Sequence, residues 1–427
     1  MSRYVVQLNS AEAADPGRFG PKAANQAALG RKGMPIPDGF CIGADVYRAQ
    51  LKAIGVEEAA LAYYGAEYKQ ANEFANQVRL GLYTSDIDPG IREELLEARA
   101  AMVGRTGALT VVRSSALVED REGSTFAGQF ESFLGLETEE DFITAVKACW
   151  AALWAPRALR YMQTHDIDPG STAMALLVQP LVDAVASGGG LSKTASGGMM
   201  VSATWGLGES IAQGEVVPDR YDLDADGNII DIATGAKKHS VSCQHHHAPH
   251  AHHNDHEHQA RQCLNEDQVG ELAGYLRRSE DMLGVPAEIE WAMDKGGIKM
   301  LQARPLHMED AIVPDAMWQK HPGLRGQPSG VGWGTGRAVV INCECEIGRI
   351  APGDILVTNV AGPALASVLP RVAGVVAELG GSTSHLASLG RERGIPMVLG
   401  VQDATEKIPD GSQVGVDGVA GIVRWVQ

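Results

Sequence analysis

A strand, turn and helix pattern near the C-terminus constrains this chain more than any other feature. Val372 to Glu378 is apolar and rich in β-branched residues, which predicts a buried strand. Gly380 and Gly381 predict a turn, and Leu386 to Arg393 predicts a short helix that ends before Pro396. The residues between the glycines and this helix therefore lie at a helix N-terminus.

His385 is the chemically distinctive residue of this segment. Ser382 or Thr383 is predicted to cap the helix, which puts His385 in its first turn. A helix N-terminus offers free N–H groups and partial positive charge, which favour an attached phosphate and a neutral, nucleophilic imidazole. The alternative is a capping loop with an incidental histidine, and the spacing alone does not decide between the two.

A second pattern lies in the N-terminal part of the chain. Val111 to Ser115 predicts a strand that contains Arg113, and Gly123 to Gln129 follows as a loop of small residues. Backbone N–H groups of such a loop could approach phosphates closely, with the arginine beside them. The alternative is an ordinary surface turn.

Two strands joined by Asp294 to Gly297 predict a hairpin. Its register would set Glu290 opposite Gln302, and Glu288 opposite Arg304, on one face. A carboxylate and an amide oxygen there suit a hard cation, and the guanidinium suits phosphate oxygens. The alternative is an exposed cross-strand salt bridge.

Composition limits the class of protein and its partners. A chain of 427 residues predicts two or three domains, and its helical segments mixed with strands indicate an α/β (α+β) fold. The net charge of −17 argues against nucleic acid or an anionic membrane as a partner. No apolar run reaches the ~20 residues of a membrane span, and the N-terminus lacks a signal-peptide core, so we expect a cytoplasmic enzyme.

The prolines and glycines after residue 306 predict a bipartite chain. We expect a first domain over residues 1–310, a linker over 311–328, and a second domain over 329–427. The cysteines are few and scattered, which predicts reduced thiols, and Cys343 and Cys345 in a probable strand are weak support for a metal site. The His-rich loop 243–258 could bind transition metals, or be a solvated insertion that binds them adventitiously.

The C-terminal motif resembles a known domain. Gly380 to His385, with Arg393 to Gly400 behind it, is similar to the phosphohistidine swivelling domain of phosphoenolpyruvate synthase, pyruvate phosphate dikinase and rifampicin phosphotransferase. In that family the histidine of a Thr-Ser-His triplet carries the phosphoryl group, and the matching residue here is His385. The resemblance implies a small β/β/α swivelling domain.

The rest of the chain resembles the ATP-grasp nucleotide-binding domain of the same family. Matching segments occur in family order, among them Phe19 to Asn25, Arg113 to Phe133 and Ile289 to Pro305. The resemblance implies these roles for residues of this sequence: Lys22, Arg113 and Arg304 hold the phosphates of ATP, Gly128 lies in the loop over them, Gln179 and Leu181 border the adenine, and Glu290 and Gln302 hold Mg²⁺.

The resemblance implies a dikinase-type phosphotransferase. His385 would take the β-phosphoryl group of ATP, release AMP, and pass the group to an acceptor. Relatives bind their acceptors in domains that have no counterpart in this chain, so a partner subunit or the domain interface would bind it. Gly188 to Ser196 also departs from the family pattern. The alternative is a nucleotide-sensing regulatory subunit without net transfer.

Overall fold

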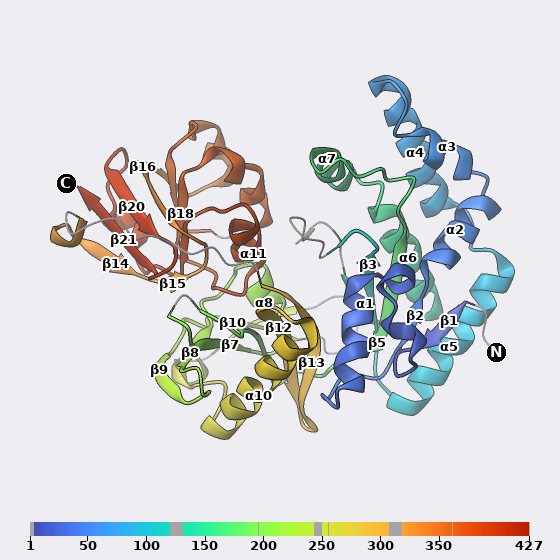
Figure 1. Ribbon diagram of the computed structural model, residues 1–427, viewed down its shortest axis with the longest axis horizontal. Helices are drawn as coiled ribbons and strands as arrows, with labels where there is room; N and C mark the ends of the chain where they lie inside the picture. Colours follow the sequence, from blue (N-terminus) through green and yellow to red (C-terminus); the bar gives the residue numbers. More distant parts are fainter. Residues whose placement is uncertain are drawn as a thin grey trace. The chain divides into compact units, whose positions relative to one another are not determined.

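The chain folds into two compact units of mixed helices and strands (Figure 1). The computed structural model describes residues 4–119, 130, 132–194, 196–242, 250–254, 256–306, 318–360 and 362–426. The first unit comprises Met1–Asp183, Cys243–His250 and Lys299–Arg304, and the second comprises Ala184–Ser242, Ala251–Ile298 and Pro305–Gln427. No helix among the described residues is long and apolar enough to cross a membrane.

The first unit is built on an antiparallel sheet with the strand order β1-β2-β5-β3-β4. Its strands are β1 (Val5–Gln7), β2 (Phe40–Ile42), β3 (Thr110–Ala116), β4 (Ser132–Leu136) and β5 (Met174–Pro180). Its helices are η1 (Glu12–Ala14), α1 (Pro16–Arg31), α2 (Ala44–Ala53), α3 (Glu57–Ala62), α4 (Tyr68–Thr84), α5 (Pro89–Thr106), α6 (Glu139–Ala152) and α7 (Pro156–Thr164).

The two faces of this sheet bury different sets of side chains. Val112, Leu176 and Val178 face a large core that includes residues of α2 and α4 to α7. Leu177 faces the other way and packs with Phe19 and Ala23 of α1. Because side chains alternate along a strand, Arg113, opposite Leu177, lies on the α1 face.

The second unit contains an antiparallel sheet with the strand order β12-β6-β7-β8-β9. Its elements are β6 (Ala186–Leu191), β7 (Met199–Trp205), α8 (Glu209–Ala212), β8 (Asp219–Leu223), β9 (Ile229–Ala233), β10 (His239–Ser242), β11 (His250–His253), α9 (His256–Ala260), α10 (Glu266–Leu283) and β12 (Ala287–Asp294). The predicted turn is confirmed: β13 (Gly297–Pro305) begins two residues after β12, and the Gly296 N–H donates to Asp294 Oδ1 at 2.7 Å.

The C-terminal part of the second unit forms a mixed sheet with the strand order β14-β21-β20-β16-β17-β18-β19-β15. The predicted buried strand is confirmed as β18, whose residues are all buried. The strands are β14 (Gly323–Arg325), β15 (Gln327–Pro328), β16 (Trp333–Ile341), β17 (Ile355–Thr358), β18 (Gly374–Ala377), β19 (Met397–Leu399), β20 (Gln413–Asp417) and β21 (Ile422–Val426). The helices are η2 (Trp318–Lys320), η3 (Glu344–Arg349), η4 (Pro363–Ser367), η5 (Leu369–Arg371), α11 (His385–Glu392) and α12 (Ala404–Lys407).

The last residues of the expected linker are part of this sheet. β14 pairs with β21, and β15 pairs with β19. Prolines and glycines are tolerated in short edge strands, so their presence does not separate a linker from an edge strand when the pairing partner lies far along the chain. Residues 311–317 of the expected linker lie outside the described residues.

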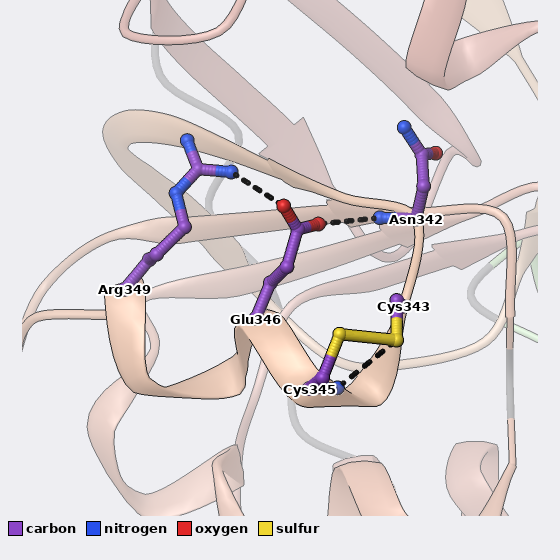
Figure 2. Close-up of a disulfide and its surroundings, with 5 residues drawn as sticks. All are labelled: Asn342, Cys343, Cys345, Glu346 and Arg349. Carbon is purple, nitrogen blue, oxygen red and sulfur yellow. Dashed lines mark hydrogen bonds and ion pairs between the residues drawn. A yellow bond between two sulfur atoms is a disulfide. The ribbon is translucent and has the colours of Figure 1, made fainter.

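The prediction of reduced cysteines is wrong for one pair. Cys343 and Cys345 are joined by a disulfide at the start of η3, not placed in a strand (Figure 2). The Cys345 N–H donates to Cys343 Sγ, and Glu346 accepts from the Asn342 N–H at 3.2 Å (Figure 2). Cys41, Cys149 and Cys263 are free and buried. Burial raises the pKa of Cys41 to about 12, which keeps its thiol protonated.

Part of the His-rich loop 243–258 has regular structure. β11 pairs with β10, and α9 begins at His256, so this part is not the disordered segment that its composition suggested. Trp205 donates its indole N–H to the carbonyl oxygen of His258 at 2.8 Å. Residues 243–249 and 255 lie outside the described residues.

A buried ion pair lies at one end of strand β8 in the second unit. Lys237 and Asp219 form an ion pair, and neither side chain is exposed. Asp219 also accepts from the backbone N–H groups of Gly235 and Cys263, both at 2.8 Å. These contacts compensate the desolvation of the carboxylate at the first residue of β8.

We predict that Lys237→Met destabilises the protein by about 3–5 kcal/mol, because it leaves the Asp219 carboxylate buried without its cation. Thermal unfolding followed by circular dichroism measures the change, and hydrogen exchange should show faster opening at β8. Lys238→Met is the matched control, since Lys238 is exposed, and its effect should stay within about 0.5 kcal/mol. A Lys237→Met protein as stable as the parent would contradict this account.

Candidate functional site

Close packing between α1 and β3 positions the first predicted phosphate ligand. Gly20 lies in α1 with φ +72°, and a Cβ there would come within 2.3 Å of the Ser115 carbonyl oxygen. Ser115 donates its hydroxyl to the Phe19 carbonyl at 2.7 Å and accepts from the Ala23 N–H at 3.1 Å. These contacts orient the helical turn that carries Lys22 toward β3.

Lys22, Arg113 and Gln302 come together in the first unit. The Lys22 ammonium donates to the Ser114 carbonyl at 2.9 Å and lies 3.5 Å from a carboxylate oxygen of Glu119. Arg113 donates to Oε1 of Gln302 at 3.0 Å and to the Leu301 carbonyl at 2.6 Å. Two cations therefore lie near one segment of β3, where they contact backbone and amide oxygens and one carboxylate.

Side chains of α1 attach β13 to this cluster. Asn25 donates to the Ala303 carbonyl at 3.1 Å, and Gln26, which is fully buried, donates to the Met300 carbonyl at 2.6 Å. Arg304 is two residues beyond Gln302, so both side chains lie on one face of β13, and both are buried. The sequence analysis did not identify Asn25 and Gln26 as positioning residues, because the carbonyl groups they bind lie more than 270 positions away along the chain.

The predicted adenine ligands lie near the end of β5. Gln179 is opposite Val111 in the β3–β5 ladder, so it shares the α1 face with Arg113. It is buried, and its side-chain amide donates to the Pro37 carbonyl at 3.4 Å. Leu181 donates its backbone N–H to the Leu109 carbonyl oxygen at 2.7 Å. Gly128 lies outside the described residues.

His385 is the first residue of α11, which confirms its predicted place in the first helical turn. The predicted caps, Ser382 and Thr383, are wrong. Ser384 is the N-cap, and its hydroxyl accepts from the Ala387 N–H at 3.2 Å. Ser382 is committed elsewhere, because its hydroxyl donates to the Pro328 carbonyl at 2.6 Å. The half-buried side chain of His385 therefore belongs to the first residue of a capped helix.

The loop before His385 packs on one face of the β12-β6-β7 sheet, here called the docking face. Its central positions are Gly189, Ser202 and Glu290, because Gly189 lies opposite both of the other residues in the strand register. A Cβ on Gly189 would come within 2.8 Å of Thr383, and the hydroxyls of Ser202 and Thr383 are 2.8 Å apart. The loop that carries His385 thus lies against the strand segment that is paired with Glu290.

Glu288, two residues before Glu290 on the same face, is buried and paired with α11. Its Oε2 accepts from Arg391 at 3.0 Å, and its Oε1 accepts from the Ser388 hydroxyl at 3.3 Å. The sequence analysis assigned Arg304 as its neighbour and did not predict Arg391. A contact between positions 103 residues apart leaves no local pattern in the sequence.

A carboxyl near the docking face has a raised pKa. Burial chiefly, and the nearby charge of Glu215, raise the pKa of Glu209 above its ordinary value, and a hydrogen bond from Gln213 opposes this rise. The adjacent Gly208 lies near Ser187, which is on the same strand face as Gly189. This edge of the docking face is therefore poorly solvated.

The two predicted Mg²⁺ ligands have the oxygen chemistry that this ion prefers. Glu290 is half-buried in the second unit, and Gln302 belongs to the first unit, so their mutual approach stays a prediction. The Gln302 oxygen that accepts from Arg113 has a second lone pair for a cation. Over the ranges that the structure describes, no group of three or more His, Cys, Asp or Glu side chains could hold a metal ion.

Comparison with known protein families gives two matches that together cover most of the chain. Residues 17–321 match the family described as "Pyruvate phosphate dikinase, AMP/ATP-binding domain". Residues 350–421 match the family described as "PEP-utilising enzyme, mobile domain". The predicted fold class, an ATP-grasp domain followed by a small phosphohistidine domain, is confirmed.

Curated relatives match the chain nearly from end to end. It is 28% identical to "Probable phosphoenolpyruvate synthase" of Methanothermobacter thermautotrophicus over 99% of this chain and 64% of that protein. It is 30% identical to "Phosphoenolpyruvate synthase" of Pyrococcus furiosus, over 99% of this chain, and of Escherichia coli, over 100% of this chain. The chain covers 58% of each of these two proteins, so it spans less than two thirds of its relatives.

We predict that Gly20→Ala destabilises the protein by about 1–3 kcal/mol and weakens ATP binding, because the methyl group would push α1 and Lys22 away from β3. Gly33→Ala is the matched control, since Gly33 has φ +74° but nothing within 4 Å of an added Cβ. The control therefore isolates the backbone strain from the clash. Calorimetric titration with ATP and thermal unfolding measure both effects, and equal losses in the two variants would contradict the role of close packing.

Proposed function

Because the chain belongs to the pyruvate phosphate dikinase family, through its AMP/ATP-binding domain and a mobile domain, we propose that it is an ATP-dependent phosphotransferase that acts through phosphohistidine at His385. One observation carries the proposal. His385 begins a capped helix whose preceding loop lies against the strands that bear Glu290. We propose a nucleotide-binding domain over residues 1–310 and a phosphohistidine domain over 329–427. The family matches cover residues 17–321 and 350–421, and strands β14 and β15 extend the sheet of the second domain back to Gly323.

In the proposed reaction, a nitrogen of neutral His385 attacks the β-phosphorus of ATP. A P–N bond forms, the bond from the β-phosphorus to the oxygen that bridges it to the α-phosphate breaks, and AMP leaves with that oxygen. The pyrophosphorylated histidine then loses its terminal phosphoryl group to water or to inorganic phosphate, and the remaining phosphohistidine serves an acceptor.

Lys22, Arg113 and Arg304 are proposed to bind the phosphates. Neutral carbonyl and amide oxygens accept from Lys22 and Arg113. Phosphate oxygens are stronger acceptors for a guanidinium, so we expect Arg113 to leave Gln302 when ATP binds. Glu290 and Gln302 would hold Mg²⁺, which when bound draws charge from the polyphosphate.

The acceptor is proposed to be presented by a partner subunit or to bind at the domain interface, in a phosphoenolpyruvate synthase-like or phenylphosphate synthase-like reaction. No observation favours an acceptor within the residues that the structure describes.

The first test is to incubate the chain with Mg²⁺ and ATP labelled at the β-phosphate. We expect acid-labile label on the peptide that contains His385, and one AMP released per labelled histidine. His385→Asn should abolish both the label and AMP formation while ATP binding stays unchanged. His321→Asn is the matched control, because His321 lies in the same unit and packs on Trp318 instead of the docking face.

AMP formation that continues in His385→Asn would overturn the mechanism. ATP binding without label in the parent chain would favour a nucleotide-sensing regulatory subunit. Glu290→Ala tests the proposed metal site, since it should weaken ATP binding only when Mg²⁺ is present. Equal weakening with and without Mg²⁺ would remove Glu290 from the metal site.

A further inference from the structure

Glu288 and Arg391 form the most buried charged contact between the docking face and α11. Their side chains are 5% and 7% exposed, and the guanidinium lies 3.0 Å from Oε2 of Glu288. Arg391 is on α11 of the small C-terminal domain, and Glu288 is on β12 of the neighbouring sheet. The pair therefore joins the part of the unit that carries His385 to the part that carries Glu290.

Arg391 also fixes the loop that presents His385. It donates to the Ser382 carbonyl at 2.6 Å, three residues before the histidine, and lies 3.4 Å from the Ser388 hydroxyl. Ser388 in turn donates to Oε1 of Glu288. Both carboxylate oxygens of Glu288 thus accept from α11, and one guanidinium connects the docking face to the His385 loop.

Neutral groups also make contacts across this surface. Ser202 and Thr383 share a hydrogen bond, and Gln327 donates to the Pro218 carbonyl at 3.2 Å. Gly381 lies so close to Pro218 that an added Cβ would be 2.9 Å from its ring. Small residues allow the approach, and the Glu288–Arg391 pair adds a charged, directional contact.

We propose that Glu288 and Arg391 are positioning residues that hold the His385 helix on the docking face in the ATP-facing state and release it when the domain moves to its acceptor. A buried ion pair contributes little net stability, because each ion regains hydration when the pair separates. Its geometry is nevertheless demanding, so it selects one docked orientation without holding it permanently. This proposal rests on the function proposed above.

A cysteine pair at Ser202 and Thr383 can report docking independently of chemistry. Their hydroxyl oxygens are 2.8 Å apart, so S202C/T383C side chains are within reach of a disulfide when the helix is docked. The background carries serine at Cys243, Cys343 and Cys345, and Cys41, Cys149 and Cys263 are buried. With oxidised glutathione as oxidant, mass spectrometry follows the rate of disulfide formation.

We expect E288Q to slow this cross-linking by at least about tenfold, because a neutral amide removes the buried carboxylate that pairs with Arg391. R391Q should slow it similarly, and R391K, which keeps the charge, should be intermediate. In the R391Q background, E288Q should have no further effect. R349Q is the matched control, since Arg349 pairs with Asp410 inside the small domain, and its rate should equal that of the parent.

Cross-linking at the parent rate in E288Q, or additive effects of E288Q and R391Q, would overturn the proposal. Thermal unfolding of each variant separates loss of docking from loss of folding. With native Ser202 and Thr383, E288Q should also slow phosphorylation of His385 without changing the dissociation constant for ATP. If the parent chain forms no phosphohistidine, the proposed function fails while cross-linking still decides the role of the pair.

Discussion

The approach of the His385 loop to the neighbouring sheet depends on the missing side chain at Gly189. A single Cβ at this central strand position would come within 2.8 Å of Thr383. Without it, the hydroxyls of Ser202 and Thr383 reach hydrogen-bonding distance, and α11 lies close enough for Arg391 to reach Glu288. The absence of a Cβ at Gly189 therefore allows polar contacts between the His385 loop and the sheet, which a larger residue would prevent.

In the first unit, packing between α1, β3 and β13 positions the side chains of Lys22 and Arg113. Lys22 donates to the Ser114 carbonyl, and Arg113 donates to the Leu301 carbonyl and to the side-chain oxygen of Gln302. Asn25 and Gln26 attach β13 to α1, so Gln302 and Arg304 are fixed relative to Lys22. The electrostatic environment is thus established by ordinary packing, and a polyphosphate would exchange weak acceptors for stronger ones.

Local patterns predicted the elements of this structure well. The strand around Arg113, the turn at Gly296 and the helix that starts at His385 each depend on residues close in sequence, and each is confirmed. The cap was assigned to the wrong hydroxyl because several adjacent residues could serve, and only the packing of Ser382 against Pro328 excludes it. Strands β14 and β15 were missed because their partners lie far along the chain.

The sequence by itself determined that a histidine lies at a helix N-terminus. It also predicted cations near a phosphate-binding strand, and carboxylate and amide oxygens for a metal ion. These predictions follow from residue types and short spacings, because residues close in sequence adopt a predictable local geometry. Only the tertiary structure decided that Glu288 pairs with Arg391 and that Lys237 neutralises Asp219. Burial of a charge requires a partner, and which distant residue supplies it depends on how strands and helices pack.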